Sequence, residues 1–388
     1  QQIIIDPESH TLRFDNTSSG TEIEDEQLQF NAEYAFTIDN ISLHSAYKRE
    51  NSFFNYSGGL EYSPDFSEMQ GYKFKRSSNG YSAAIKFMNN QISYPIDLEN
   101  IQFSFFYEQI MDHLPSSLFA DRIEENSNSE WHESSYMFSS TMIGGNNDLF
   151  FKSHFNYSVN FRIPTIYQQV TSLMYPVNNN WGSKLQTEYK VNYELGTSIF
   201  SNFAGALNIS QSEISCVIFN SSYKNKFRMI QLGGTPLTLL DNYKDANIFG
   251  VETYISTEFK KAGSLYFSYI KYIIPDKAAF PFKPESKLTS KLVFDFKGLN
   301  IDLIYYKESR RAGWIINYIS DNNGMALQEL ILEKYGNIDV HIKKTIELWR
   351  LKCFLSASGR NLINNSLALQ GIAIRDRRFY LTIGVEFD

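Results

Sequence analysis

The sequence contains only two cysteines, Cys216 and Cys353, among its 388 residues. Two cysteines cannot build a disulfide framework, and Cys353 lies on the apolar phase of its segment, where it acts as a small apolar residue. No apolar run approaches the roughly 18 residues that a membrane-spanning helix needs, and the mean hydropathy is −0.33. If this chain enters a membrane, it must therefore do so as a closed β-structure, the other way to satisfy backbone polar groups in lipid.

Positive charge is also scarce, because 36 Lys and Arg stand against 43 Asp and Glu, for a formal charge of −7. Binding to phosphate backbones needs a basic face, so we expect no nucleic-acid partner. The sequence has no H-E-x-x-H, C-x-x-C or G-x-S-x-G motif. We therefore expect no enzyme, no catalytic residue, no metal site and no cofactor, and we interpret His154 and His341 as ordinary polar residues of a wall.

Aromatic residues are abundant, with 31 Phe and 25 Tyr, which suits strands and membrane-interface girdles. The last segment alternates strictly between apolar and other residues, its apolar members being Phe379, Leu381, Ile383, Val385 and Phe387. Alternation of this kind puts apolar side chains on one face of a strand. In a soluble sheet that face would point into a core, whereas in a transmembrane barrel it would contact lipid.

The lengths of the connections decide between these two interpretations. Going back from the end, the expected links alternate between long and short: 361–376, 349–350, 307–336, 297–298, 274–286, 260–263, 224–246 and 201–205. Outer-membrane barrels have short periplasmic turns and long extracellular loops. The sequence therefore predicts an all-β, transmembrane, antiparallel up-and-down barrel, with the long loops outside the cell.

We expect about 16–18 strands in this chain, since single-chain bacterial barrels favour an even number. The N-terminal segment 1–26 contains at most one weak strand, and the barrel occupies 27–388. Upstream strands are expected near 27–38, 41–48, 52–62, 71–77, 80–89, 101–110, 133–143 and 151–162. The segment from Met325 to Lys334 fits either a short helix or an extended strand tip, and we favour the helix.

Six short motifs, in order over residues 151–388, resemble the C-terminal barrel of TonB-dependent outer-membrane receptors. They are Phe161-Arg162-Ile163-Pro164 with Ile166-Tyr167, Tyr193-Glu194-Leu195-Gly196, Ile248 to Glu252, Pro281 to Pro284, Gly359 to Asn364, and Arg377 to Leu381. The resemblance implies a location in the bacterial outer membrane, in contact with its lipid. It also implies that the alternating C-terminal strand, Phe379 to Phe387, is the signal read by the outer-membrane assembly machinery.

The family has a plug domain inside a barrel of 22 strands, and this chain has no segment that fits a plug. We therefore expect a separate chain or a cleaved upstream segment to supply the plug and the remaining N-terminal strands. Coupling to TonB would act only through that plug. The function implied is uptake of a scarce nutrient of the siderophore, cobalamin, peptide or glycan class. The alternative is a receptor-derived barrel that serves as a structural or assembly component of a larger complex, without transport.

Three charged residues next to family motifs, Arg162, Glu194 and Glu252, lie on the polar phase of their strands. They are the candidates for contact with a ligand, although each also fits a hydrated lumen wall. The aromatic loop residues Tyr175, Trp181, Phe280 and Phe282 would either contact a ligand or pack within their own loops. The sequence leaves these alternatives open.

Overall fold

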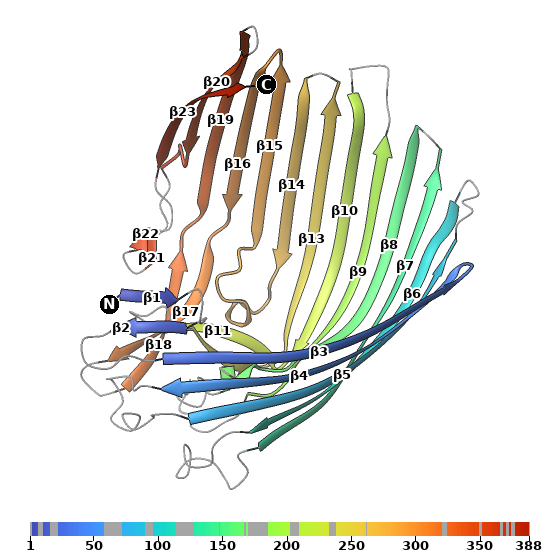
Figure 1. Ribbon diagram of the computed structural model, residues 1–388, viewed down its shortest axis with the longest axis vertical. Helices are drawn as coiled ribbons and strands as arrows, with labels where there is room; N and C mark the ends of the chain where they lie inside the picture. The colour runs from blue at the N-terminus through green and yellow to red at the C-terminus, as the bar shows by residue number, and fades with distance from the viewer. Residues whose placement is uncertain are drawn as a thin grey trace.

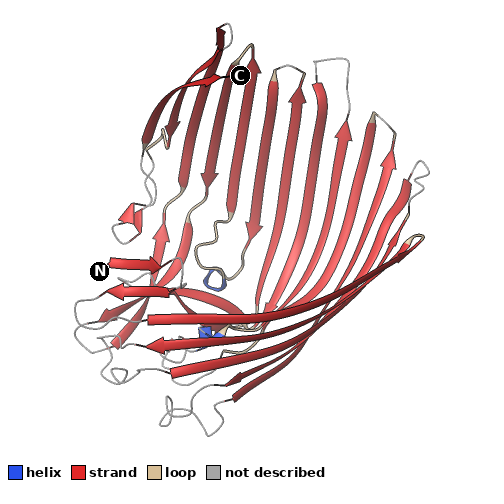
Figure 2. Ribbon diagram, in the orientation of Figure 1, coloured by secondary structure: helices blue, strands red, loops and turns tan. Residues whose placement is uncertain are grey.

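The computed structural model shows a large, strongly curved sheet of long strands (Figures 1 and 2). The residues that the structure describes are 2–6, 11–15, 22–57, 72–89, 96–113, 128–146, 148–166, 168–169, 185–201, 209–232, 238–260, 262–319, 324–348, 351–364, 368–369, 372–373 and 377–387. No helix within these ranges is both long enough and apolar enough to span a membrane.

The main sheet contains 15 antiparallel strands, and each pairs with the strand of this sheet that comes before or after it in the chain. Its strands are β3 (Glu22–Ile38), β4 (Ile41–Ser57), β5 (Tyr72–Met88), β6 (Ile96–His113), β7 (Asn128–Gly145), β8 (Leu149–Arg162), β9 (Glu188–Ser201), β10 (Ile209–Lys224), β13 (Ala246–Phe259), β14 (Gly263–Ile273), β15 (Ser286–Phe296), β16 (Leu299–Glu308), β19 (Tyr335–Leu348), β20 (Leu351–Arg360) and β23 (Arg378–Phe387). This is the up-and-down all-β architecture that the sequence predicts.

Shorter strands lie outside the main sheet. The pairs β1 (Gln2–Asp6) with β2 (Thr11–Asp15) and β21 (Ala368–Leu369) with β22 (Ile372–Ala373) form two small hairpins. A four-stranded sheet combines β11 (Lys226–Leu232), β12 (Thr238–Tyr243), β17 (Arg311–Ile319) and β18 (Gly324–Leu332). The 3₁₀ turn η4 (Lys277–Ala279) lies in the connection between β14 and β15.

Short and long connections alternate around the whole main sheet. Short links join β3 to β4, β13 to β14 and β15 to β16, and these turns lie at one end of the strands (Figure 1). The long links carry the four-stranded sheet and η4, and they lie at the other end. The links 202–208 and 349–350 fall outside the described residues, and the first is longer than the expected 201–205. The predicted alternation of short and long connections is confirmed by the bounds of the strands on either side of each connection.

One face of the sheet is apolar and the other is polar. Leu195, Ile342, Leu381 and Ile383 are all exposed on the first, which we call the outer face. The second, which we call the inner face, carries hydrogen-bonded polar side chains and is the face onto which the long connections fold. A barrel in lipid needs this distribution, with apolar residues outside and polar residues inside.

Six tyrosines form a belt across the outer face of β4–β9. Ring centres are 5.0 Å apart for Tyr47 and Tyr81, 6.4 Å for Tyr81 and Tyr107, 6.0 Å for Tyr136 and Tyr157, and 4.9 Å for Tyr157 and Tyr193. Aromatic girdles mark the membrane–water interfaces of barrels. Toward the short turns the outer face continues with Leu43, Ile85 and Phe103, whereas toward the long connections it becomes polar.

Two details of the sequence interpretation are wrong. The segments 41–48 and 52–62, and likewise 71–77 and 80–89, were expected as separate strands, but β4 and β5 each run without a break through Asn51 and Gly80. The ladder to neighbouring strands is continuous there, so the turn-forming residues stay extended. The favoured helix at Met325–Lys334 is instead β18, because Arg311–Ile319 pairs with it residue by residue and tertiary pairing overrides local propensity.

The strands β3 and β23 are the two edges of the main sheet, and within the described part of the chain they do not pair with each other. The strand β23 pairs along its length with β20, from Leu351↔Phe387 to Arg360↔Arg378. The strand β3 begins at Glu22, slightly before the expected boundary at residue 27.

Candidate functional site

The sheet forks at the end where the long connections lie. The strands β7 and β8 pair from Gly145↔Phe150 to Tyr136↔Val159, but β7 extends to Asn128 and β8 to Arg162 without further pairing to each other. The hydroxyl of Tyr189 crosses this fork and donates to both carboxylate oxygens of Glu133, at 2.7 and 2.8 Å. The ends of β7 and β8 therefore separate at the point where β8 ends and the connection to β9 begins.

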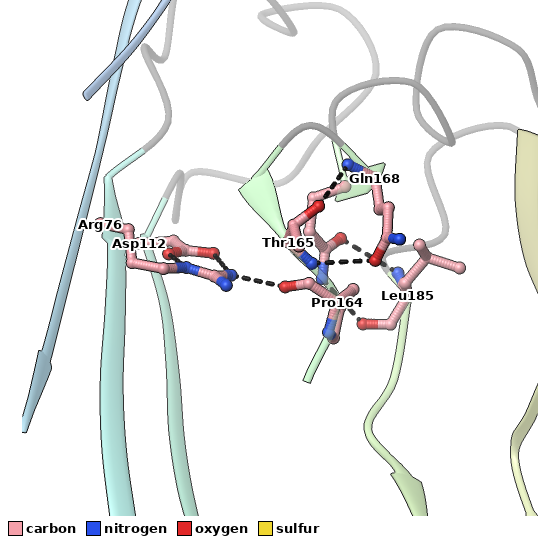
Figure 3. A network of polar contacts seen from close by, with 7 residues as sticks. Arg76, Asp112, Pro164, Thr165, Gln168 and Leu185 are labelled. Carbon is pink, nitrogen blue, oxygen red and sulfur yellow. Dashed lines mark hydrogen bonds and ion pairs between the residues drawn. The ribbon is translucent and has the colours of Figure 1, made fainter. Parts of the chain in front are cut away.

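A buried ion pair anchors this connection to the inner face (Figure 3). Arg76 on β5 and Asp112 on β6 stand directly opposite each other and form two hydrogen bonds of 2.6 Å. The same guanidinium donates to the carbonyl oxygen of Pro164, also at 2.6 Å. Bidentate arginine–carboxylate pairs are strong and directional, so this contact fixes the position of the Phe161-Arg162-Ile163-Pro164 segment.

The connection is held at its two ends by further hydrogen bonds. Thr165 and Gln168 bond reciprocally, side chain to backbone, at 3.0 and 3.2 Å, as in a capping box (Figure 3). The buried side chain of Gln169 bonds to both the N–H and the carbonyl of Leu185, at 3.2 and 3.0 Å. Gln169 and Leu185, at the two described ends of the connection, therefore lie side by side.

A cavity of about 340 Å³ lies on the inner face next to this anchor. Phe106 and Phe161 stack with ring centres 5.8 Å apart, and both line the cavity. Its charged lining consists of Lys48, Glu50, Arg76, Glu108 and Arg162. Lys48 pairs with Glu50 at 2.6 Å, and the guanidinium of Arg162 lies 5.2 Å from the ring centre of Phe227. This cavity offers both signs of charge next to aromatic surface.

The other long connections fold together on the same side of the sheet. The hairpins β11–β12 and β17–β18 are joined by a parallel pairing of Gln231 with Ile315 and Leu232 with Ile316. Phe280 is buried together with Ala246, Ile248, Ile274 and Ala279, against Tyr223, Tyr243 and Tyr272. The loops thus form a layer that packs against apolar side chains of the main sheet, and we call it the loop layer.

Polar contacts fasten the loop layer to β9 and also hold its parts together. Glu188 at the start of β9 accepts from Lys226 at 2.7 Å and from the backbone N–H of Phe227. Arg228 pairs with Asp241 through two hydrogen bonds, and its guanidinium lies 4.8 Å from the ring centre of Tyr243. Asp276 caps η4 and accepts from the hydroxyl of Tyr243 at 2.9 Å. Burial, followed by the hydrogen bond to Asp276, raises the pKa of Tyr243 above its usual value.

The three candidate residues from the sequence lie on the inner face but are not brought together. Arg162 lines the cavity at the fork. Glu194 lies further down the wall, where it accepts from Asn156 at 2.8 Å and contacts His154 at 3.2 Å. Glu252 lies on β13 opposite Val217 and Ile270. Their role in ligand contact remains a prediction.

Two of the four aromatic loop residues lie in the part of the chain that the structure describes. Phe280 is buried in the loop layer, and the ring of Phe282 lies over Gly313, so both pack within the loops. Tyr175 and Trp181 lie outside the described residues. The C-terminal residues Phe379, Leu381, Ile383 and Val385 are exposed on the outer face of β23, which leaves their reading as an assembly signal a prediction.

Sequence reasoning missed Arg76 and Asp112 as well as the basic residues of the loop layer. Arg76 shares the phase of Tyr72 and Phe74 in its expected strand 71–77, and Asp112 lies just beyond the expected strand 101–110. No group of three or more His, Cys, Asp or Glu side chains placed to hold a metal ion occurs in the described ranges.

No family model and no curated protein matches this sequence. Solved structures do match. The copper transporter OprC has 10% identity and a TM-score of 0.66, with 96% of this chain and 60% of that chain covered. The ferric citrate transporter FecA has 11% identity and a TM-score of 0.63, with 97% and 56% covered. BauA, the ferric preacinetobactin receptor from Acinetobacter baumannii, has 11% identity and a TM-score of 0.57, with 98% and 56% covered.

These three proteins are TonB-dependent receptors. At such low identity the likeness concerns the fold, and this chain has the fold of the barrel part of TonB-dependent receptors, an integral outer-membrane barrel. The predicted resemblance is confirmed. The chain spans 56–60% of the length of these three structures.

Proposed function

We propose that this chain is the barrel part of an outer-membrane receptor that takes up a scarce nutrient of the siderophore, cobalamin, peptide or glycan class. The observation that carries the proposal is the loop layer folded onto the inner face of a wall with an apolar outer face. In a receptor, such a layer would bring charged and aromatic side chains to the entrance of the lumen. The chemistry is non-covalent capture, so no residue of the chain acts as a catalyst.

The partners follow from the edges of the sheet. Within the described residues, β3 and β23 each pair along one side only. A row of unpaired backbone groups in lipid costs several kcal/mol per group, so both edges would pair with strands of another chain or of a cleaved segment. The same partner would supply a plug inside the lumen, and TonB would act through that plug.

Mild-detergent purification from outer membranes, followed by mass spectrometry, tests the partner. A co-purifying polypeptide or upstream fragment that cross-links to β3 or β23 is the expected result. A chain purified alone, with β23 cross-linked to its own β3, contradicts it.

Uptake is tested with a strain that lacks the gene and the same strain complemented with it. Growth is measured with iron chelates, cobalamin, peptides or glycans as the limiting nutrient. We expect a defect with one nutrient that complementation repairs. Normal growth on every nutrient, together with a stable stoichiometric outer-membrane complex, would instead establish the structural or assembly role.

A further inference from the structure

Four lysines gather on the inner face beneath the loop layer, and they come from four different elements. Lys190 lies on β9, Lys226 on β11, Lys283 in the connection after η4, and Lys287 on β15. All three of the others act electrostatically on Lys283. Such a gathering of like charges is unfavourable unless something negative offsets it.

Three aromatic rings line the same place. The ammonium of Lys283 lies 4.2 Å from the ring centre of Tyr272, and that of Lys226 lies 4.9 Å from Tyr223. Lys190 lies 5.9 Å from the ring centre of Tyr223, which stands directly opposite it in the sheet. Phe280 meets Tyr223 edge to face, with ring centres 5.5 Å apart. The rings stabilise the cations on one side, and the other N–H donors of Lys190 and Lys283 can then bond to oxygen acceptors.

The carboxylates of the chain only partly balance these charges. Glu188 pairs with Lys226 at 2.7 Å, and Glu308 pairs with Lys287 at 3.5 Å and with Arg311 at 3.2 Å. Glu252 is the remaining carboxylate that acts on Lys283. The described salt bridges include none to Lys190 or Lys283. Five basic groups therefore face three acidic ones.

Lys283 is partly buried and also lies among these like charges. Burial, followed by the charge of Lys287, lowers the pKa of Lys283 below its usual value, with Lys190 and Lys226 acting in the same direction and Glu252 against them. Backbone hydrogen bonds fix the turn that carries the lysine, because Phe282 donates its N–H to the carbonyl of Ala312 at 2.6 Å and Lys283 donates its N–H to the carbonyl of Phe280 at 3.2 Å.

We propose that Lys190 and Lys283, between the rings of Tyr223 and Tyr272, form a subsite for an anionic ligand with carboxylate or phosphate oxygens. The subsite deepens the proposed function, on which it rests, by naming the charge class of the nutrient. The oxygens of the ligand accept hydrogen bonds from the two ammonium groups, and its apolar part lies against the rings. Lys226 and Lys287, already paired, provide the surrounding positive field.

Amine labelling of the full-length protein in outer-membrane vesicles tests the subsite, with pyrophosphate and citrate as separate probes. A brief pulse of an acylating reagent at pH 8 modifies neutral lysines, and peptide mass spectrometry reads each site. An anion that restores one pKa unit lowers the reactive amine fraction about tenfold. We expect this loss of reactivity at Lys283, together with steric shielding of Lys190 by the bound anion, and neither effect at Lys297 in the turn at the other end of the sheet.

The variant Lys283→Gln should lose most of the protection at Lys190, whereas the control Lys297→Gln should keep it. Heat-modifiable gel mobility confirms that both variants are folded. Equal protection at Lys297, or no protection compared with chloride at the same ionic strength, overturns the proposal. Protection by phosphate alone or carboxylate alone identifies the preferred oxygen chemistry. Because labelling reads the protein directly, a negative result removes the subsite without touching uptake, and an uptake failure leaves the subsite in place.

Discussion

Arg76 and Asp112 stand opposite each other on β5 and β6 and share two parallel hydrogen bonds, with side-chain exposures of 11% and 1%. The pair also holds Pro164, which lies far along the chain, through its carbonyl oxygen. A contact between neighbouring strands therefore determines where the connection after β8 leaves the wall.

Removing the carboxylate of this pair should destabilise the protein strongly. Asp112→Ala leaves the Arg76 guanidinium buried without its partner, at a cost of about 3–5 kcal/mol. Lys48→Gln is the matched control, because Lys48 and Glu50 form a more exposed pair worth about 1 kcal/mol or less. Denaturant unfolding in detergent measures both, and equal losses would contradict the assignment of Arg76–Asp112 as the anchor.

The assignment of an outer and an inner face predicts that a lipid-phase reagent labels one set of residues and not the other. A lipid-phase reagent should reach cysteines placed at Val191, Leu195, Val340, Ile342, Leu381 and Ile383, but not at Lys190, Glu194, His341 and Thr382. Leu195→Arg at mid-bilayer should cost about 2–4 kcal/mol, whereas Lys343→Arg on the inner face should cost little. Labelling of the second set in preference to the first would reverse the assignment of faces.

The alternation of short and long connections predicts how the barrel is oriented in the membrane. The loops 224–246, 274–286, 308–336 and 361–376 should face the outside, and 201–205, 260–264, 297–298 and 349–350 should face the periplasm. Protease added to intact cells should cut within the first group alone. Cleavage after Lys260 in intact cells, with the periplasm sealed, would show the opposite orientation.

The turn between β15 and β16 needs a glycine. Lys297 and Gly298 both have positive φ, 49° and 74°, and a Cβ on Gly298 would lie 2.8 Å from the carbonyl oxygen of Thr345. Gly298→Ala should therefore cost about 1–3 kcal/mol. Gly336→Ala is the control, because its Cβ would meet nothing closer than 3.7 Å. Comparable unfolding midpoints for the two variants would be inconsistent with the strained turn.

The connection that carries η4 should loosen in acid. The hydrogen bond from Lys277 holds the pKa of Glu285 below its ordinary value of 4.5. A depressed carboxyl pKa stabilises the fold above the unfolded value, and that contribution is lost as pH falls through the folded pKa. The hydrogen-exchange protection factors of residues 274–285, relative to the intrinsic rate at each pH, should fall below about pH 4.5, and Glu285→Gln should remove this dependence while Glu333→Gln keeps it.

The sequence by itself determined the class of fold and the two faces of its wall. Alternation at Phe379, Leu381 and Ile383 depends only on the geometry of a single strand, since successive side chains point to opposite sides. Turn positions such as Lys297-Gly298 are equally local, so the parity of the connections was visible without coordinates.

The contacts between distant segments were decided only by the tertiary structure. Arg76 meets Asp112 because of the register between β5 and β6, and a shift of one residue would send the two side chains to opposite faces. The residues from Met325 to Leu332 favour a helix locally, yet pairing with β17 makes them a strand. The four lysines lie on separate elements, and each is unremarkable in its own segment. Their gathering results from the folding of the long connections onto the wall, which depends on contacts that no local pattern encodes.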